Sequence, residues 1–487
     1  MTLTIIGLGP GSADDITRRA WRTLETAETV YLRTERHPCV PDLPQNATYH
    51  SFDPLYETHD AFEDVYNAIT ETLITAAQSG DVVYAVPGDP HIAESTVVKI
   101  RARGTRAGIA VEIVSGVSFI EPTCAALGID ALDGLQLVDG LEVAAMHHPP
   151  LNPDSPALLA QVYSRAVASE VKLVLMNQYP EDFTVTLVHS AGASGTTETV
   201  PLYEIDRSEH INHLTSLYIP AVGQHSSFES FQETIAHLRA PEGCPWDREQ
   251  THASLRPYLI EEAYEVLDAL NRDDPDALKD ELGDLLLQIV LHTQIATEFG
   301  EFTMADVMQN VNAKMIRRHP HVWGDVTVDG AGNVVTNWEA IKQQEKAANG
   351  DTDNGFKSVL DDVPTSFTPT MKAAKYAKRA SKVGFDYPDI DSVKAKITEE
   401  LAEIDAAQSP EELLDECGDL MFAAVDVLRY LKVDPEVALK ATNAKFARRF
   451  RYVERRVYDS GKPMTDFTLD ELDVFWQEAK KLEKTAE

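Results

Sequence analysis

Two groups of four carboxylates recur in the same order along the chain. The first group is Glu262, Glu265, Glu281 and Asp284, and the second is Glu400, Glu403, Glu416 and Asp419. In each group two acids lie three residues apart on one predicted helix, and two more lie three apart on the next. Residues at that spacing share a helix face, so two antiparallel helices would bring all four together. A site built only from oxygen ligands suits Mg²⁺ or Mn²⁺ better than zinc or redox iron.

Basic residues follow each acidic group at a similar interval. Both copies carry Asn-Ala-Lys-x-x-Arg-Arg, with Lys314, Arg317 and Arg318 in the first and Lys445, Arg448 and Arg449 in the second. A single E-x-x-E pattern is usually a solvated helix face. Acids and bases repeated in one order favour a duplicated metal and phosphate site instead, in an internally repeated helical unit. Glu261 and Glu399, which directly precede the first acid of each group, are candidates to orient or deprotonate water.

The composition limits the classes of partner. The chain has 487 residues, enough for about three domains, and its net charge is −36. General binding to nucleic acid or to an anionic membrane needs a basic surface, and we therefore exclude both. The four cysteines form no C-x-x-C pair. No secretion signal or membrane-length apolar run is evident, and we expect a cytoplasmic protein.

Residues 1–225 alternate short apolar runs with helical segments, which predicts an α/β domain with a largely parallel sheet. The segment 15–26 reads as a helix. The predicted strands are 3–8, 81–86, 111–114, 171–176 and 217–219. Gly-rich turns follow the first three of these strands, at the edge where open α/β sheets bind ligands. The first turn is not a dinucleotide fingerprint, because Ser12 replaces a required glycine and Pro10 lacks an N–H.

The three turns, G-x-G-P-G, P-G-D-P and S-G-V-S, resemble the tetrapyrrole methylase family over residues 1–220. The resemblance implies an S-adenosylmethionine site between two α/β lobes. The family's positions correspond here to Pro10, Asp89, Ile92, Ser118 and Phe119. No residue of this region identifies the methyl acceptor.

The composition becomes helical after residue 225. Ser226 and Ser227 predict the start of a helix that runs to residue 238. We expect one all-α domain over 226–348 and a second over 356–487, separated by the Gly- and Asn-rich linker 349–355. Further helices are predicted near 303–317, 337–348, 366–381, 390–407, 410–431, 435–458 and 469–484.

The helical region resembles MazG-type nucleoside triphosphate pyrophosphohydrolases through G-C-P-W-D-x-x-Q-T-H, E-E-x-x-E, E-x-G-D and N-x-K-x-x-R-R. Behind a methylase-like domain, two such units resemble the YabN-type fusion family. The resemblance implies Mg²⁺-dependent cleavage of nucleoside triphosphates to monophosphates and pyrophosphate, and a homodimer. The Lys and Arg residues would then stabilise charge on the phosphates.

Two other functions stay open at this stage. The protein could be a methyltransferase whose helical region dimerises or regulates, or a nucleotide sensor that binds without turnover. Both acid groups are intact, so the sequence leaves the catalytic copy open, with a slight preference for the second. It does not reveal base or sugar preference.

Overall fold

The first lobe of the N-terminal region is built on a parallel sheet with the strand order β3-β2-β4-β1-β5. The structure is a computed structural model and describes residues 1–59, 61–193, 195–348, 358–361 and 363–486. The strands are β1 Thr2–Gly7, β2 Thr29–Leu32, β3 Thr48–Ser51, β4 Val82–Val86 and β5 Ala110–Val114. Their helices are α1 Arg18–Thr26, α2 Asp53–Thr58, α3 Phe62–Ala77, α4 Ser95–Ala107 and α5 Ile120–Leu127, with short 3₁₀ turns at Ala13–Asp15 and Val40–Asp42.

Apolar side chains fill both faces of this sheet. Leu3 and Ile5 on β1 pack on one side with Ile69 and Leu73 of α3. Ile6, in contrast, belongs to the cluster that contains Leu24 of α1. Successive strand residues point to opposite faces, so the continuous apolar run of β1 predicts burial on both sides. The strands predicted at 3–8, 81–86 and 111–114 are confirmed.

The second lobe has a mixed sheet with the order β6-β7-β10-β8-β9. Its elements are β6 Gln136–Asp139, α6 Gly140–Ala144, β7 Ala157–Ala160, α7 Arg165–Leu175, β8 Thr184–His189, β9 Thr196–Pro201, the 3₁₀ turn Leu202–Arg207, and β10 Thr215–Ile219. Only β6 and β7 pair in parallel; β7–β10, β10–β8 and β8–β9 pair antiparallel. The expectation of a largely parallel sheet therefore holds for the first lobe and is wrong for the second. The connection between β8 and β9 is too short for the dozen or more residues of a parallel crossover.

The strand predicted over 171–176 is wrong, because residues 171–175 lie in helix α7 and Met176 is its C-cap. The Ser164 side chain accepts a hydrogen bond from the Val167 N–H and caps the helix. The buried residues Val167, Ala168, Val171, Val174 and Leu175 recur at intervals of three and four. That spacing is helical, and the short apolar run concealed it.

The remaining chain is helical, and Ser227 caps its first helix as predicted. Up to residue 348 the helices are α8 Phe228–Arg239, α9 Pro245–Glu249, α10 Arg256–Arg272, α11 Pro275–Glu298, α12 Met304–Arg318, α13 Pro320–Trp323 and α14 Ala331–Ala348. After residue 358 they are α15 Pro369–Lys382, α16 Ile390–Ala406, α17 Pro410–Tyr430, α18 Pro435–Ser460 and α19 Leu469–Ala486, with a 3₁₀ turn at Met464–Asp466. None of the helices in the described ranges combines the length and apolar character that a bilayer span needs.

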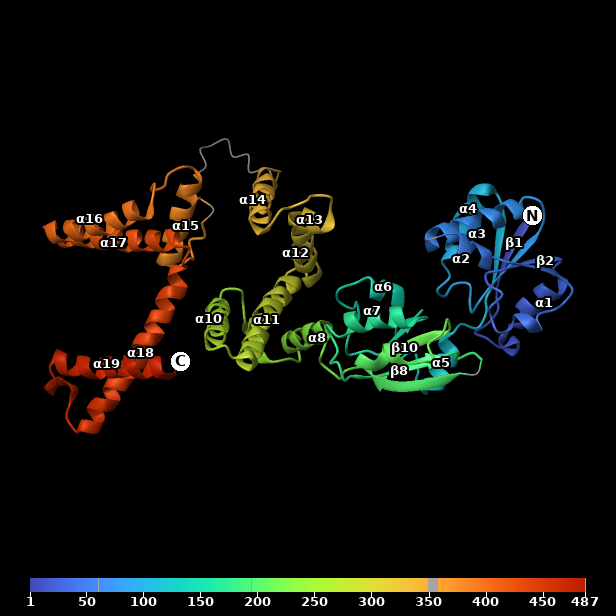
Figure 1. Cartoon of the computed structure of the whole chain (residues 1–487), viewed down its shortest axis with the longest axis horizontal. Helices are drawn as coiled ribbons and strands as arrows, with labels where there is room; N and C mark the ends of the chain where they lie inside the picture. The colour runs from blue at the N-terminus through green and yellow to red at the C-terminus, as the bar shows by residue number, and fades with distance from the viewer. Residues whose placement is uncertain (60, 194, 349–357, 362, 487) are drawn as a thin grey trace. The chain divides into compact units, whose positions relative to one another are not determined.

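Contacts divide the chain into two compact units, Met1–Thr327 and Val328–Glu487. The predicted linker 349–355 lies outside the described residues. The domain boundaries at 225/226 and 348/356 therefore stay predictions. Within each unit a pair of long helices lies side by side, α10 with α11 and α16 with α17 (Figure 1).

Candidate metal and nucleotide site

The first acid cluster, defined as Glu262, Glu265 and Glu281, lies on the hairpin of α10 and α11. Each residue offers a carboxylate oxygen within 4.8 Å of the others. Only Asp273 and Asp274 separate the two helices, and the left-handed Asp273 (φ 53°) ends the first of them. The Asp274 side chain accepts a hydrogen bond from Ala277 N–H and caps the second. This short turn makes the helices antiparallel neighbours and brings their acids together.

The first acid cluster is short of positive charge. Burial, then the nearby charges of Asp284 and Glu265, raises the pKa of Glu262 above its ordinary value. Burial and the charges of Glu265 and Asp284 also raise the pKa of Glu281, against a weaker opposite influence of Arg272. Carboxylates that repel one another in this way would be stabilised by a bound cation.

The second acid cluster, defined as Glu400, Glu403 and Glu416, has the same arrangement on α16 and α17. It contains an internal cation. Lys396 Nζ lies 2.7 Å from Glu400 Oε1 and 2.9 Å from Glu399 Oε1. The hydrogen bond from Lys396 lowers the pKa of Glu400, although burial opposes it. Glu400 is only 2% exposed, and its Oε2 atom has no hydrogen-bond partner within the described part of the chain.

The predicted fourth acids lie close to these clusters. Asp284 acts on the pKa values of both Glu262 and Glu281. Asp419 lines the same cavity as Glu400. Of the two predicted water-orienting residues, Glu261 is exposed, whereas Glu399 is bonded to Lys396.

Two of the predicted phosphate-binding cations, Arg448 and Arg449, pair with a carboxylate in this structure. Arg449 Nη2 lies 2.7 Å from Glu483 Oε2, and Arg448 Nη2 lies 3.5 Å from Glu483 Oε1, which ties α18 to α19. Lys445 lies one turn earlier on α18. Lys314, Arg317 and Arg318 lie near the C-terminal end of α12, where positive charge also complements the helix dipole. Their action on phosphate stays a prediction.

The methylase-like region holds a cavity of about 620 Å³. Its lining includes every residue predicted for S-adenosylmethionine, namely Pro10, Asp89, Ile92, Ser118 and Phe119. Asp89 accepts hydrogen bonds from Gly116 N–H at 2.9 Å and His91 N–H at 2.8 Å. The Ser118 hydroxyl donates to Glu121 Oε2 at 2.6 Å. These two side chains therefore also hold the loops that shape the cavity.

Sequence reasoning missed the polar end of this cavity. Arg33 forms an ion pair with Glu94 at 3.4 Å and lies over the rings of Tyr56 and Tyr66. Burial lowers the pKa of His37 to about 4, so its imidazole is neutral at pH 7. No motif marks these residues, because only the folded first lobe brings them to one cavity.

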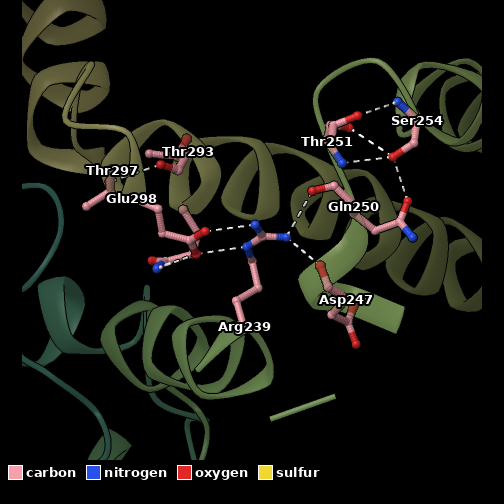
Figure 2. A network of polar contacts seen from close by, with 9 residues as sticks. Arg239, Asp247, Gln250, Thr251, Ser254, Thr293, Thr297 and Glu298 are labelled. Atoms are coloured by element: carbon pink, nitrogen blue, oxygen red, sulfur yellow. Dashed lines mark hydrogen bonds and ion pairs between the residues drawn. The ribbon is translucent and has the colours of Figure 1, made fainter. Parts of the chain in front are cut away.

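Arg239 fastens the G-C-P-W-D-x-x-Q-T-H loop to the first helical region (Figure 2). Its guanidinium makes two hydrogen bonds of 2.8 and 2.7 Å with the Glu298 carboxylate. It also donates to the carbonyl oxygens of Asp247 and Gln250. The Arg239 side chain is only 5% exposed. The motif showed that the loop matters, but its anchor on α8 was not evident from the sequence.

Sequence reasoning also missed Lys396. Its signal is simple: it lies four residues before Glu400 and therefore one turn away on the same helix face. The equivalent position before Glu262 is Tyr258. The two acid clusters thus differ at the position one helical turn before their first acid.

Three family profiles match successive parts of the chain. Tetrapyrrole (Corrin/Porphyrin) Methylases match residues 2–206, the MazG nucleotide pyrophosphohydrolase domain matches 250–323, and Phosphoribosyl-ATP pyrophosphohydrolase matches 361–445. A uroporphyrin-III-C-methyltransferase structure from Thermus thermophilus matches at 21% identity and TM-score 0.38, over 46% of this chain and 96% of that chain. The three profile matches give a methylase-like α/β domain followed by two pyrophosphohydrolase-type helical regions.

Two curated relatives cover these parts. A Thermotoga maritima nucleoside triphosphate pyrophosphohydrolase/pyrophosphatase MazG is 43% identical over 53% of this chain and 97% of its own length. YabN of Bacillus subtilis is 42% identical over 99% of both chains. The chain therefore belongs to the YabN family.

Proposed function

We propose that the helical regions form a Mg²⁺-dependent nucleoside triphosphate pyrophosphohydrolase that cleaves (d)NTPs to (d)NMPs and pyrophosphate. The observation that carries this proposal is the repeated convergence of three carboxylates on a helical hairpin. The similarity to MazG pyrophosphohydrolases supports the reaction class.

The residues of both clusters fit a hard divalent cation. Glu262, Glu265, Glu281 and Asp284 would hold Mg²⁺ or Mn²⁺ in the first, and Glu400, Glu403, Glu416 and Asp419 in the second, because carboxylate oxygens are the preferred ligands. The unpartnered Glu400 Oε2 provides a free acceptor inside the second. When bound, such a cation would supply positive charge to the triphosphate and acidify a water molecule.

In hydrolysis, the oxygen of water bonds to a phosphorus atom and the bond from that phosphorus to the pyrophosphate oxygen breaks. Glu261 and Glu399, which directly precede the first acid of each cluster, would orient the water or accept its proton. Lys314, Arg317 and Arg318, with Lys445, Arg448 and Arg449, would bind the charged phosphates. For Arg448 and Arg449 this requires exchange of the Glu483 carboxylate for phosphate.

We also propose that the N-terminal domain binds S-adenosylmethionine. The support is that all five predicted residues line one cavity. This domain would act as a methyltransferase on an acceptor that the lining residues do not identify.

A homodimer and a cytoplasmic location complete the proposal. Large apolar side chains stay exposed on the paired helices, among them Ile260, Leu270, Ile289 and Met421. We infer that a second copy of the chain covers such side chains, because exposed apolar surface is common at protein interfaces. Free cysteines, with no disulfide in the described residues, accord with a reducing compartment.

The test is pyrophosphate release from a panel of NTPs and dNTPs with Mg²⁺. Wild type is compared with Glu262→Gln, Glu400→Gln and the double variant. Glu301→Gln, which changes an exposed acid outside both clusters, is the control. We expect at least a roughly 100-fold loss when the working cluster is changed, and single variants identify that cluster.

Lack of pyrophosphate release by the wild type on every nucleotide would refute the proposal. Nucleotide binding without release would then indicate a sensor. Neither binding nor release, together with methyl transfer from S-adenosylmethionine, would indicate a methyltransferase with a regulatory helical region.

A further inference from the structure

The C-terminal unit holds a cavity of about 650 Å³ between α15, α16, α17 and the loop that joins α15 to α16. Val393, Lys396 and Glu400 line it from one face of α16. From α17 the lining residues are Asp419, Phe422, Ala423, Asp426 and Arg429. The helical spacing places each set on a single face, so the cavity follows the length of the hairpin.

The two ends of this cavity differ in chemistry. Glu400 and Asp419, both predicted metal ligands, lie at one end with Lys396. Arg429, ten residues beyond Asp419 on α17, lies about 15 Å further along the helix axis. Aromatic residues of α15 and the following loop line the cavity as well: Tyr376, Phe385 and Tyr387. A ligand whose phosphates are held by the acids would thus extend toward aromatic side chains.

The loop that carries Phe385 is fastened to α17. Arg429 Nη2 lies 2.6 Å from Asp386 Oδ1, and Arg429 Nε lies 2.5 Å from Asp426 Oδ1. The Phe385 N–H donates to the Ala380 carbonyl at 3.0 Å, and Gly384 adopts a φ of +90° that favours glycine. The backbone on both sides of Phe385 is therefore held in place.

The Phe385 ring is nevertheless 82% exposed. An aromatic ring on an anchored backbone, at the mouth of a cavity, is suited to stack on a planar ligand. Every nucleobase offers such a face. The loop thus has the properties of a stacking platform.

We propose that this cavity is the nucleoside pocket of the second helical region, in which Phe385 stacks on the base while the triphosphate reaches Glu400 and Asp419. Tyr376 and Tyr387 complete its aromatic wall. Arg429 is a positioning residue, which acts by holding Asp386 and hence the loop. This inference rests on the proposed function, because the cavity is assigned through its continuity with the second acid cluster.

The carboxylates near Phe385 do not favour one base. Both Asp386 and Asp426 are paired with Arg429, so they are not available to read base edges. Stacking without edge recognition is tolerant of base identity. Loss of the Phe385 ring should therefore weaken binding of dATP, dGTP, dCTP and dTTP by similar factors.

The primary test measures the Kd of the fluorescent nucleotide mant-dATP with Mg²⁺ in the full chain carrying Glu262→Gln, so that binding at the first cluster is weakened. Phe385→Ala should raise the Kd roughly tenfold. Phe385→Trp keeps a stacking ring and should stay within about twofold of the parent. Phe299→Ala, which changes another well-exposed phenylalanine in the first helical region, is the matched control and should leave the Kd unchanged.

Steady-state hydrolysis of the four dNTPs gives the second readout. If the second cluster turns over, Phe385→Ala should raise KM about tenfold for each base and leave kcat within about twofold. Arg429→Gln should raise the Kd by a similar factor, and Arg429→Lys, which can still pair with Asp386, should recover most of the affinity. A merely structural role would lower Tm without this recovery.

The outcomes separate the two proposals. Pyrophosphate release by the wild type with unchanged Kd and KM in Phe385→Ala would overturn this inference and leave the proposed function standing. A changed oligomeric state with unchanged Kd would also overturn it, because Phe385 would then belong to an interface. Phe385-dependent binding without release would support the pocket and refute the hydrolase. Absence of both binding and release would refute both.

Discussion

The two helical hairpins present the same acids but not the same charge balance. In the first, Glu262 and Glu281 repel neighbouring carboxylates, and Tyr258 occupies the position one turn before Glu262. In the second, Lys396 occupies that position and bonds to Glu399 and Glu400. The difference shows that a repeated motif can retain its ligands while one outer residue changes their electrostatics.

The loops beside the hairpins also differ in construction. In the first region Arg239 reaches from α8 to Glu298 and to loop carbonyls, and the loop presents Trp246 against Tyr258. In the second, Arg429 reaches from α17 to Asp386, and the loop presents Phe385. Each region thus uses an arginine to hold an aromatic-bearing loop, but from a different helix.

The largest expected effects come from removing these arginines. Arg239→Ala and Arg429→Ala should each lower the free energy of unfolding by about 3 kcal/mol, because each leaves acids without their buried partner. Calorimetry should resolve the affected transition. Arg239→Lys and Arg429→Lys are the charge-retaining controls. A loss below about 0.5 kcal/mol would show that the loops are held by other contacts.

The next largest effect should be on metal affinity, when the residue one helical turn before the first acid of a cluster is replaced. Lys396→Met removes a cation that competes for Glu400, and Mn²⁺ should bind the second cluster roughly fivefold more tightly, the factor that corresponds to one partly exposed ion pair. Tyr258→Lys should weaken Mn²⁺ binding at the first cluster by a similar factor. Titration calorimetry measures both. Unchanged affinities would remove Lys396 as the source of the difference.

The glycines of the two E-x-G-D motifs provide a smaller and symmetric test. A Cβ added at Gly283 or Gly418 would meet no atom within 4 Å among the described residues. Because alanine favours a helix interior over glycine, Gly283→Ala and Gly418→Ala should each stabilise the protein by about 0.8 kcal/mol. Urea unfolding gives the value. Destabilisation by only one variant would show that a partner packs on that hairpin alone.

The smallest expected effect concerns how the stability of two matched variants, Glu262→Gln and Glu400→Gln, depends on pH when EDTA removes divalent cations. The two dependences should have opposite signs. The raised pKa of Glu262 stabilises the folded state below the ordinary value of 4.5, and this contribution is lost as pH rises through the folded pKa. The lowered pKa of Glu400 stabilises the folded state above pH 4.5, and this contribution is lost as pH falls through the folded pKa.

Thermal unfolding at pH 4 and pH 7 measures this effect. Glu262→Gln should raise Tm more at pH 7 than at pH 4, since it removes a repelled charge. Glu400→Gln should lower Tm more at pH 7, since it removes the partner of Lys396. Changes of the same sign in both variants would contradict the proposed difference between the clusters.

Much of the architecture follows from local sequence. The strands at the Gly-rich turns, the Ser227 helix cap and the duplicated acids were all predictable, because each depends on residues close together in the chain. The segment 171–176 was predicted wrongly, since a short apolar run is compatible with either a strand or a buried helix. The antiparallel pairing in the second lobe depended on which strands become neighbours, which local pattern does not encode.

The sequence by itself determined the identity and order of the acids, their helical spacing and the family to which the chain belongs. Tertiary structure alone decided what surrounds those acids: Arg239 paired with Glu298 of another helix, and Phe385 at the mouth of a cavity that begins at the acids. The physical reason is the distance along the chain over which each interaction acts. Helix periodicity acts over a few residues, whereas burial, ion pairing and cavity shape depend on side chains that only the packed fold brings together.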